Sequence, residues 1–175
     1  MYTQKPTVCW VYSAGQAVLT TPYKSIVRPH LECCSTTWNP HYSKDKVLLE
    51  RIQHRFTQMF PHLRSLSYEN RLRQLGLWFL EERRNKADLT ELFKMTKGFS
   101  STPRSHFSKK AEDTSTRGHT WKLVKKHSGC DTRLHFFSQR VINKWNNLSQ
   151  EYVDSQSINC FKGQLRKTCM ADGLF

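Results

Sequence analysis

The run SKDKVLLERIQHRFTQMF, residues 43–60, most constrains what this chain folds into. Its apolar residues recur at intervals of three and four, the spacing that places side chains on one face of a helix. Ser43 suits the N-cap position, and Pro61 ends the helix because its ring cannot follow in an α-helical ladder. The face predicted to point into a core comprises Leu48, Leu49, Ile52, Phe56, Met59 and Phe60.

The opposite face of this predicted helix carries Arg51, Arg55 and Gln58. Arg51 and Arg55 are i,i+4 neighbours of like charge, which destabilises an isolated helix by roughly a few tenths of a kcal/mol. A polyanionic partner would relieve that repulsion. The pattern is compatible with a binding surface and also with an ordinary solvated face.

The charge balance of the chain favours a polyanionic partner. Lys and Arg outnumber Asp and Glu by 28 to 14, which gives a net charge of +14. A surplus of this size is typical of proteins that bind nucleic acid or an anionic membrane surface. Hydrophobic residues make up only 37% of the chain, so parts of it are expected to be extended. The ten Phe, six Tyr and five Trp argue against a wholly disordered chain.

The cysteines and the first residues bear on location. None of the six cysteines forms a C-x-x-C pair, and no secretory signal precedes them, so free thiols in a reducing compartment are expected. The apolar run 8–19 is too short and too polar to span a membrane. We therefore expect an intracellular protein, in the nucleus or the cytoplasm, without a membrane partner.

The rest of the chain is dominated by further helical patterns, and the expected fold class is mainly α. The predicted helices are 23–38, 43–60, 67–75, 80–97, 137–148 and a short one after Ser157. Residues 119–125 and 130–136 are predicted to pair as a small hairpin around Ser128-Gly129. The expected organisation is a leader (1–22), a helical domain (23–98), a linker (99–118), a C-terminal segment (119–168) and a tail (169–175).

Several runs of the sequence, in order, resemble the region that follows the palm in reverse transcriptases of LINE-type, jockey-like non-LTR retrotransposons. The first are YKSIVRPHLE at 23–32, WNP at 38–40 and LLERIQHRFT at 48–57. Further runs are YE-x-RL at 68–72, LGL at 75–77, LEERR at 80–84 and DL at 88–89. The last are TRGH at 116–119, FFS-x-RVIN-x-WN-x-L at 136–148 and FK at 161–162. The similarity covers about residues 23–168, and it departs from the family pattern at Cys33, Ser149 and residues 1–22.

The resemblance implies a thumb-like helical bundle over 23–98, followed by the smaller hairpin-plus-helix segment. In such RNA-directed DNA polymerases, helices of this region grip the template–primer duplex. We therefore expect RNA, DNA or a hybrid to be the partner, bound with low sequence specificity through phosphate contacts. A palm-containing polymerase or a second copy of the chain are further candidate partners. The candidate phosphate contacts are Arg51, Arg55, Arg71, Arg73, Arg83, Arg84, Lys122, Lys125, Lys126 and Arg140.

The sequence lacks the residue pattern that nucleotidyl transfer requires. That reaction uses carboxylates that hold two divalent ions, whereas the chain contains no Asp-Asp pair. It also contains no P-loop, no G-x-S-x-G and no H-E-x-x-H pattern. We expect a truncated, non-catalytic fragment of a polymerase. The alternatives are a protein-interaction or self-associating module, or an element remnant without a selected role.

The nearest approach to a metal-binding pattern is His127-x-x-Cys130-x-x-x-x-His135, with His119 upstream. A structural zinc site takes four ligands at recognisable spacing, and no second pair is present here. The alternative is a set of surface histidines in a basic hairpin. We therefore expect no metal site and no cofactor.

Overall fold

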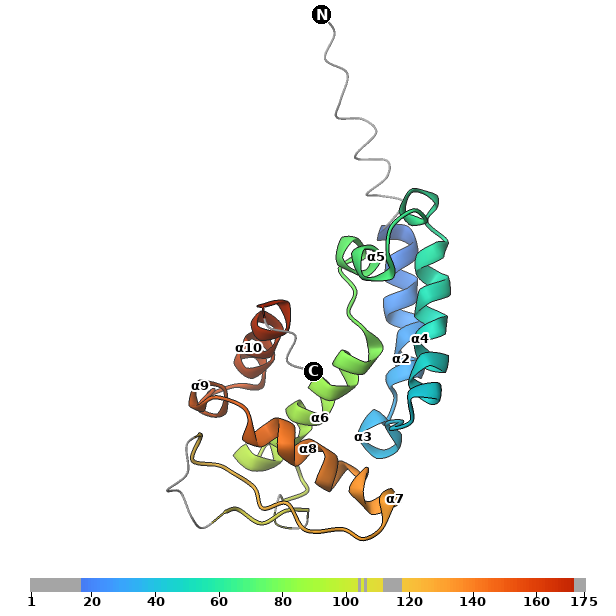
Figure 1. Cartoon of the computed structure of the whole chain (residues 1–175). Coiled ribbons are helices and arrows are strands. Elements are labelled where there is room, and N and C mark those ends of the chain that lie inside the picture. Colours follow the sequence, from blue (N-terminus) through green and yellow to red (C-terminus); the bar gives the residue numbers. More distant parts are fainter. Residues whose placement is uncertain (1–16, 104, 106, 112–117, 172–175) are drawn as a thin grey trace, which may run out of the picture. The chain divides into compact units, whose positions relative to one another are not determined.

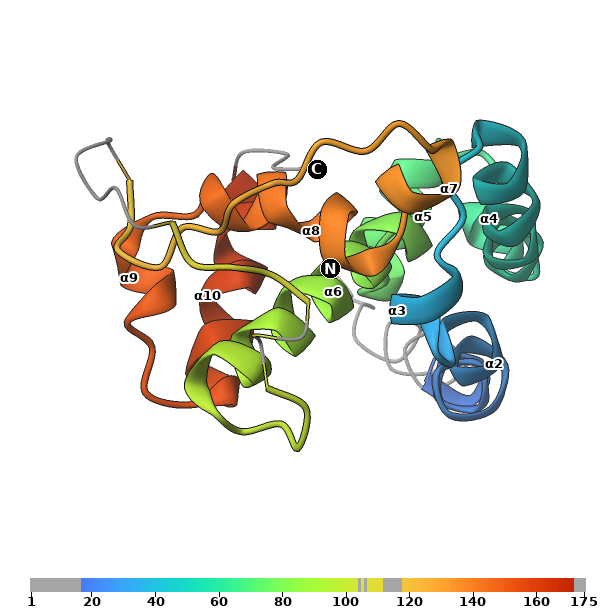
Figure 2. The ribbon, with the colours of Figure 1, turned by 90° about the horizontal axis from the view of Figure 1, so that it is seen from below.

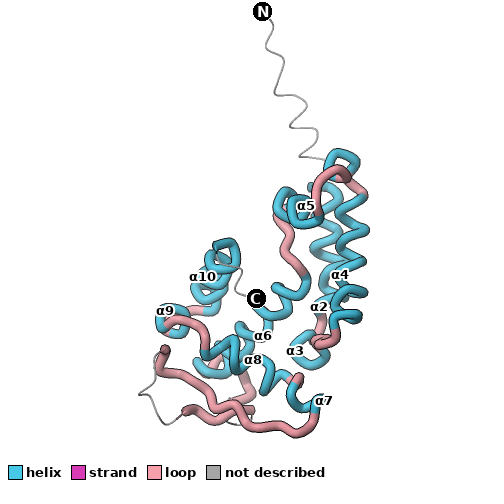
Figure 3. Tube along the Cα trace, viewed as in Figure 1, coloured by secondary structure: helices cyan, strands magenta, loops and turns pink. Residues whose placement is uncertain are grey.

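The chain is mainly helical, as predicted. The computed structural model describes residues 17–103, 105, 107–111 and 118–171. Within these ranges the residues form helices joined by loops, and none lies in a strand (Figure 3). Predictions for residues 1–16 of the leader, for part of the linker and for 172–175 fall outside the described residues.

The described chain divides into two compact units, each with its own core. Residues 17–33 and Tyr42–Glu81 form the first unit, and Cys34–His41 and the residues from Glu82 onward form the second. We predicted a division in the linker 99–118 instead. The difference arises because the helix over 80–97 packs its apolar face, with Phe93 stacked on Phe161, against the C-terminal segment.

The first unit is built from helices that pack around aromatic and leucine side chains. In Figure 1 the helical stretch that ends in α2 runs antiparallel beside α4. Its core comprises Tyr23, Phe60, Leu63, Leu72, Leu75 and Leu77. The helical elements are residues 17–22, η1 (Tyr23–Val27), α2 (Arg28–Glu32), α4 (Ser43–Gln58), η2 (Pro61–Leu63) and α5 (Tyr68–Leu75).

The first predicted helix ends earlier than expected. Instead of continuing to residue 38, it stops at Glu32, and Cys34 adopts a left-handed conformation with a φ of 52°. The spacing of apolar residues over 23–38 predicts one inner face made of Ile26, Val27, Leu31, Cys34 and Trp38. This was wrong, because Ile26 is 63% exposed while Tyr23 is buried. Tyr23 takes the inner position by stacking on Phe56 at 4.0 Å between ring centroids.

Helix α4 is present where predicted, but the prediction of its inner face was partly wrong. Leu48, Ile52 and Met59 are 54%, 43% and 57% exposed, whereas Gln53 and Thr57 are fully buried. Phe56 and Phe60 do face the core, as expected. The helix is thus rotated relative to the prediction, and it buries the two polar side chains of Gln53 and Thr57 while three apolar side chains are exposed.

Gln53 is tolerated in the core because its side-chain amide has partners on several segments. Its Oε1 accepts a hydrogen bond from the Tyr23 hydroxyl at 2.9 Å, and its Nε2 donates to the Trp78 carbonyl at 2.9 Å. Glu50 and the Tyr68 hydroxyl also lie within hydrogen-bond distance of Nε2. A buried amide that is satisfied in this way avoids the desolvation penalty of an unpaired polar group.

Glu50 extends this network to the start of α6 (Leu80–Lys97). One carboxylate oxygen accepts a hydrogen bond from the Tyr68 hydroxyl, and the other accepts one from the Leu80 backbone N–H at 3.0 Å. A carboxylate at a helix N-terminus satisfies a free donor and complements the helix dipole. Burial, followed by the hydrogen bond to Glu50, raises the pKa of Tyr68, so the hydroxyl remains protonated and continues to donate.

The second unit surrounds a larger apolar core. Apolar residues at helical spacing predict one inner face for the helix over 80–97 and one for the helix over 137–148. The prediction is confirmed for Leu89, Leu92 and Phe93 of α6 and for Val141, Ile142 and Trp145 of α8, which are all buried. It was wrong for Ala87 of α6, which is exposed. Figure 2 shows α6, α8 and α10 gathered around this core. The other elements are α3 (Ser35–Trp38), α7 (Asp131–Leu134), α8 (Phe137–Asn146), α9 (Gln150–Val153) and α10 (Ile158–Ala171).

The predicted hairpin between 119–125 and 130–136 does not form. Residues 131–134 are helical, and Leu123 instead makes an isolated antiparallel bridge with Lys110. Asn146 of α8 exchanges two side-chain hydrogen bonds with the Leu123 backbone, each at 2.9 Å. The amide of Asn146 therefore substitutes for a neighbouring strand and holds this extended segment against α8.

The buried amide network gives the first prediction. Replacement of Gln53 by Ala leaves the Trp78 carbonyl and the Tyr23 hydroxyl without their buried partner. We expect the free energy of unfolding to fall by roughly 2–4 kcal/mol. Urea unfolding followed by circular dichroism measures this change. The matched control is Gln58→Ala on the exposed face of the same helix, which should change the free energy by about 0.5 kcal/mol or less. Equal effects of the two substitutions would contradict the account.

Candidate nucleic-acid interface

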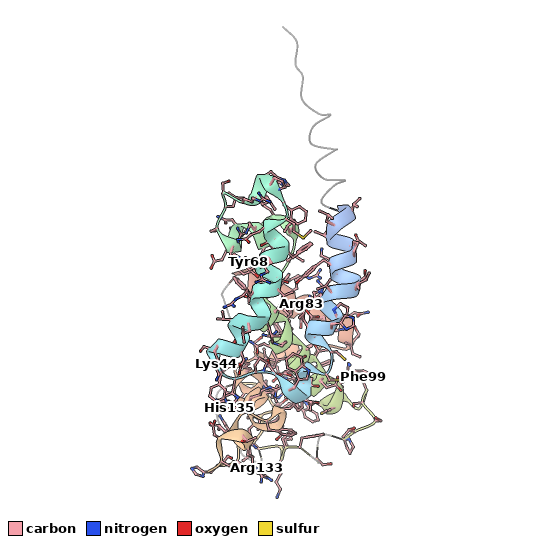
Figure 4. The ribbon with its side chains drawn as sticks, turned by 90° about the vertical axis from the view of Figure 1, so that its right-hand side faces the viewer. Lys44, Tyr68, Arg83, Phe99, Arg133 and His135 are labelled. Carbon is pink, nitrogen blue, oxygen red and sulfur yellow. The ribbon has the colours of Figure 1, made fainter. Side chains whose placement is uncertain are left out.

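The solvent-facing side of α4 carries positive charge along its length. Lys44, Arg51 and Arg55 are all exposed, and their separations of seven and four residues place them on one face. Lys44 lies in the first turn of the helix (Figure 4). Among the described residues, no acidic side chain forms an ion pair with Arg51 or Arg55. We call Lys44, Arg51 and Arg55 the α4 basic face.

The polar network on the inner side of α4 fixes the rotation of the helix that turns the α4 basic face toward solvent. Gln53 and Thr57 lie on the opposite side of the helix from Arg51 and Arg55, and both are fully buried. Glu50 of α4 is engaged by Tyr68 and Leu80 instead of by the basic face. Among the described residues, neither Arg51 nor Arg55 forms an ion pair with an acidic residue of the same helix.

Lys44 was not among the predicted contacts. It precedes Arg51 by seven residues, so the helical spacing itself places the two on one face. Arg73 was predicted to face outward, and it is exposed. It lies on α5, where its Nη1 donates to Asn70 Oδ1 at 3.0 Å.

Arg71 and Arg84, two of the candidate phosphate contacts, were expected to be exposed as such contacts must be, but both are buried. Arg71 is only 5% exposed, with its Nη2 2.9 Å from His54 Nε2 and its guanidinium above the Tyr68 ring. Arg84 is 1% exposed, and its Nε donates to Asn39 Oδ1 at 3.0 Å. A guanidinium enclosed in this way is not accessible to a phosphate group. We therefore no longer consider either arginine a candidate phosphate contact.

Arg140 is also a structural residue. Its Nε and Nη2 donate to the two carboxylate oxygens of Asp88 at 2.9 and 3.0 Å, the bidentate geometry that suits this pair. The same guanidinium donates to the backbone carbonyls of Ser35, Thr36 and His135. Burial raises the pKa of Asp88 above its ordinary value, although Arg140 acts in the opposite direction. Arg140 therefore joins four segments of the second unit and has little capacity left for phosphate.

The remaining predicted contacts differ in exposure. Lys125 and Lys126 are exposed in the second unit, on the loop that leads to α7. Lys122 and Arg83 are half-buried. The exposed members of the predicted set are therefore two arginines on α4, Arg73 on α5, and two lysines of the second unit.

The histidine and cysteine pattern noted in the sequence does not assemble either. His119 is buried, its Nδ1 accepts from the Trp121 backbone N–H at 3.1 Å, and its Nε2 lies 2.9 Å from the Trp145 carbonyl. His127 is exposed on the loop before α7. Cys130 and Cys160 are exposed free thiols.

No protein-family model, no curated protein and no solved structure matches the chain. No helix in the described part of the chain combines the length and apolar character that crossing a membrane requires.

The environment of His119 predicts a pH dependence of stability. Burial lowers the pKa of His119 below its ordinary value of 6.5, because its neutral form is the one that fits between Trp121 and Trp145. A group whose pKa is lower in the folded state contributes stability above its unfolded pKa, and that contribution is lost as the pH falls toward the folded value. We therefore expect the free energy of unfolding to decrease when the pH falls below about 6.5.

Urea unfolding at a series of pH values tests this expectation when the wild type is compared with His119→Gln. The difference in stability between the two proteins should shrink on acidification. His127→Gln is the matched control, because His127 is exposed. A difference that is constant with pH would show that His119 is not responsible.

Proposed function

We propose that this chain binds the phosphate backbone of nucleic acid through the α4 basic face. The observation that carries the proposal is the pair Arg51 and Arg55, one helical turn apart and exposed, without an acidic partner among the described residues. Their mutual repulsion is unfavourable in the free protein, and a polyanion would remove it. The net charge of +14 adds a long-range attraction to the same partner.

The chemistry of the face suits phosphate rather than bases. Arginine presents several N–H donors in a planar fork that matches two phosphate oxygens. Along the helix axis, Arg51 and Arg55 are separated by about 6 Å, so they would engage different phosphates. Contacts of this kind release counterions and carry no sequence information. The expected partner is RNA, DNA or a hybrid, bound with low sequence specificity.

The resemblance to the post-palm region of non-LTR reverse transcriptases supports the same proposal. Runs that carry the resemblance contact one another in the second unit: Asp88 pairs with Arg140, and His119 lies beside Trp145. These later runs therefore belong to one packed unit, whereas the runs at 23–32, 48–57 and 68–77 lie in the first unit. We propose that the chain is a thumb-like fragment that grips template–primer and performs no nucleotidyl transfer itself. We also propose an intracellular role, in the nucleus or the cytoplasm.

Removal of two charges from the α4 basic face tests the proposal. The double substitution Arg51→Ala and Arg55→Ala should weaken binding to a fluorescently labelled RNA–DNA hybrid. It should also reduce the slope of log affinity against log salt by roughly 1.5 to 2, because two phosphate contacts are lost. Fluorescence anisotropy titrations at several salt concentrations measure both quantities.

The matched control is Lys162→Ala with Arg166→Ala on α10. These two residues are also exposed and four positions apart, so the same charge is removed from another helix. The control should leave the salt slope nearly unchanged. If the two double variants reduce the slope equally, net charge rather than the α4 basic face governs binding. If neither does, this proposed function is wrong.

A second candidate function is self-association or the binding of a protein partner. It is favoured by Leu48, Ile52 and Met59, which lie on the solvent side of α4 next to the basic face and are each more than two-fifths exposed. Exposed apolar side chains that gather on one surface often mark an interaction site. The same helix would then contact protein through these residues and not nucleic acid through the arginines.

Light scattering distinguishes this candidate from the first. If α4 mediates self-association, the apparent mass should rise with protein concentration, and Leu48→Gln with Ile52→Gln should abolish that rise. Because both side chains are exposed, the double variant should keep its helical circular dichroism signal. A mass that stays monomeric over the whole concentration range excludes self-association through this face.

A further inference from the structure

Three side chains that commonly bind metal ions meet in the second unit. They are His41, Asp131 and His135, and one ligand atom from each lies within 4.8 Å of the other two. The Asp131 carboxylate oxygens are 3.6 Å from His41 Nε2 and 3.3 Å from His135 Nε2. The two imidazole rings stack with centroids 4.1 Å apart and planes at 5°. His135 lies directly after α7, close to Arg133 in Figure 4.

Partly buried hydrogen bonds hold the two segments that supply these ligands. The Arg140 guanidinium donates to the carbonyls of Ser35 and Thr36 at 3.2 and 2.7 Å, and its Nη1 donates to the His135 carbonyl at 3.2 Å. Arg84 adds a hydrogen bond to Asn39, two residues before His41. The segment that ends at His41 and the turn at His135 are thus fixed by the same arginine. These contacts hold the backbone of the two ligand-bearing segments together, which keeps the three side chains near one another.

We propose that His41, Asp131 and His135 bind a zinc ion. Two imidazole nitrogens and one carboxylate oxygen form a donor set that suits zinc and neighbouring transition metals better than calcium or magnesium. Three protein ligands leave one tetrahedral position for water. Asp131 is 63% exposed, so the ion and the water can enter from solvent. This site is independent of the proposed nucleic-acid contacts.

The stacked rings imply a small rearrangement on binding. A neutral imidazole binds a metal ion along the lone pair of its nitrogen, which lies in the plane of the ring. Two parallel stacked rings share no point that lies in both planes, so His41 or His135 must turn about its Cβ–Cγ bond. Both side chains are about one-third exposed, which leaves room for that rotation. Metal binding should therefore remove the ring stacking.

Cobalt titration followed by zinc displacement tests the site. The full chain, freed of metal with a chelator, is titrated with Co²⁺, and the visible absorption of the bound ion is recorded. We expect one equivalent to bind and Zn²⁺ to displace it. His41→Ala, His135→Ala and Asp131→Asn should each lower the affinity by roughly 100-fold or more. The controls His127→Ala and Cys130→Ser remove nearby ligand-type residues outside the cluster, and they should retain the wild-type affinity.

Circular dichroism of the variants and NMR of the wild type distinguish loss of the zinc site from loss of the fold. Circular dichroism establishes that each variant is folded, and Asp131→Asn is the variant least prone to unfold because Asp131 is exposed. Imidazole NMR signals of the wild type should shift for His41 and His135 together when Zn²⁺ is added. Absence of zinc binding by the wild type would overturn the proposal. Zinc binding that depends on His127 or Cys130, and not on His41, would overturn it as well.

Discussion

The orientation of α4 depends on the buried side-chain amide of Gln53. Its oxygen accepts from Tyr23, and its nitrogen donates to the Trp78 carbonyl, so three segments of the first unit meet at one polar group. Glu50 continues the network to the first backbone N–H of α6. Because a buried polar group is stable only when it is fully paired, these contacts specify one rotation of the helix. That rotation exposes Arg51 and Arg55, and it exposes Leu48, Ile52 and Met59 as well.

Arg140 has the corresponding role in the second unit. Its guanidinium pairs with Asp88 on α6. It also donates to the backbone carbonyls of Ser35 and Thr36, which precede α6 in the sequence, and of His135, which follows α6. An arginine with donors in several directions can join segments that share no apolar contact. Two residues predicted to bind phosphate, Arg140 and Arg84, therefore stabilise the fold instead. The positive charge of the chain is divided between structural arginines and exposed ones, and only the exposed ones are available to a partner.

The spacing of apolar residues was enough to predict which residues of a helix are buried where the buried face is purely apolar. The inner residues of α8 and most of those of α6 were predicted correctly, because Leu, Val, Phe and Trp recur there at helical spacing. The same reasoning failed for α4, because the partners that allow Gln53 to be buried lie on other segments, which periodicity along one helix does not reveal. The burial of Arg71 and Arg84 was also not predicted, because their partners His54 and Asn39 lie on other segments. The cluster of His41, Asp131 and His135 was missed because His41 is far in the sequence from Asp131 and His135, which are only four residues apart.

Contact between the exposed arginines of α4 and nucleic-acid phosphate can be observed in NMR spectra of the arginine Nε–Hε groups, recorded while a short RNA–DNA hybrid is added at moderate salt. We expect the signals of Arg51 and Arg55 to shift first and most strongly, while those of the buried Arg71 and Arg84 stay in place. Uniform small shifts of all exposed arginines would indicate non-specific attraction by net charge alone. Strong shifts confined to Arg166 or Arg133, with Arg51 and Arg55 unchanged, would show that α4 does not bind the hybrid.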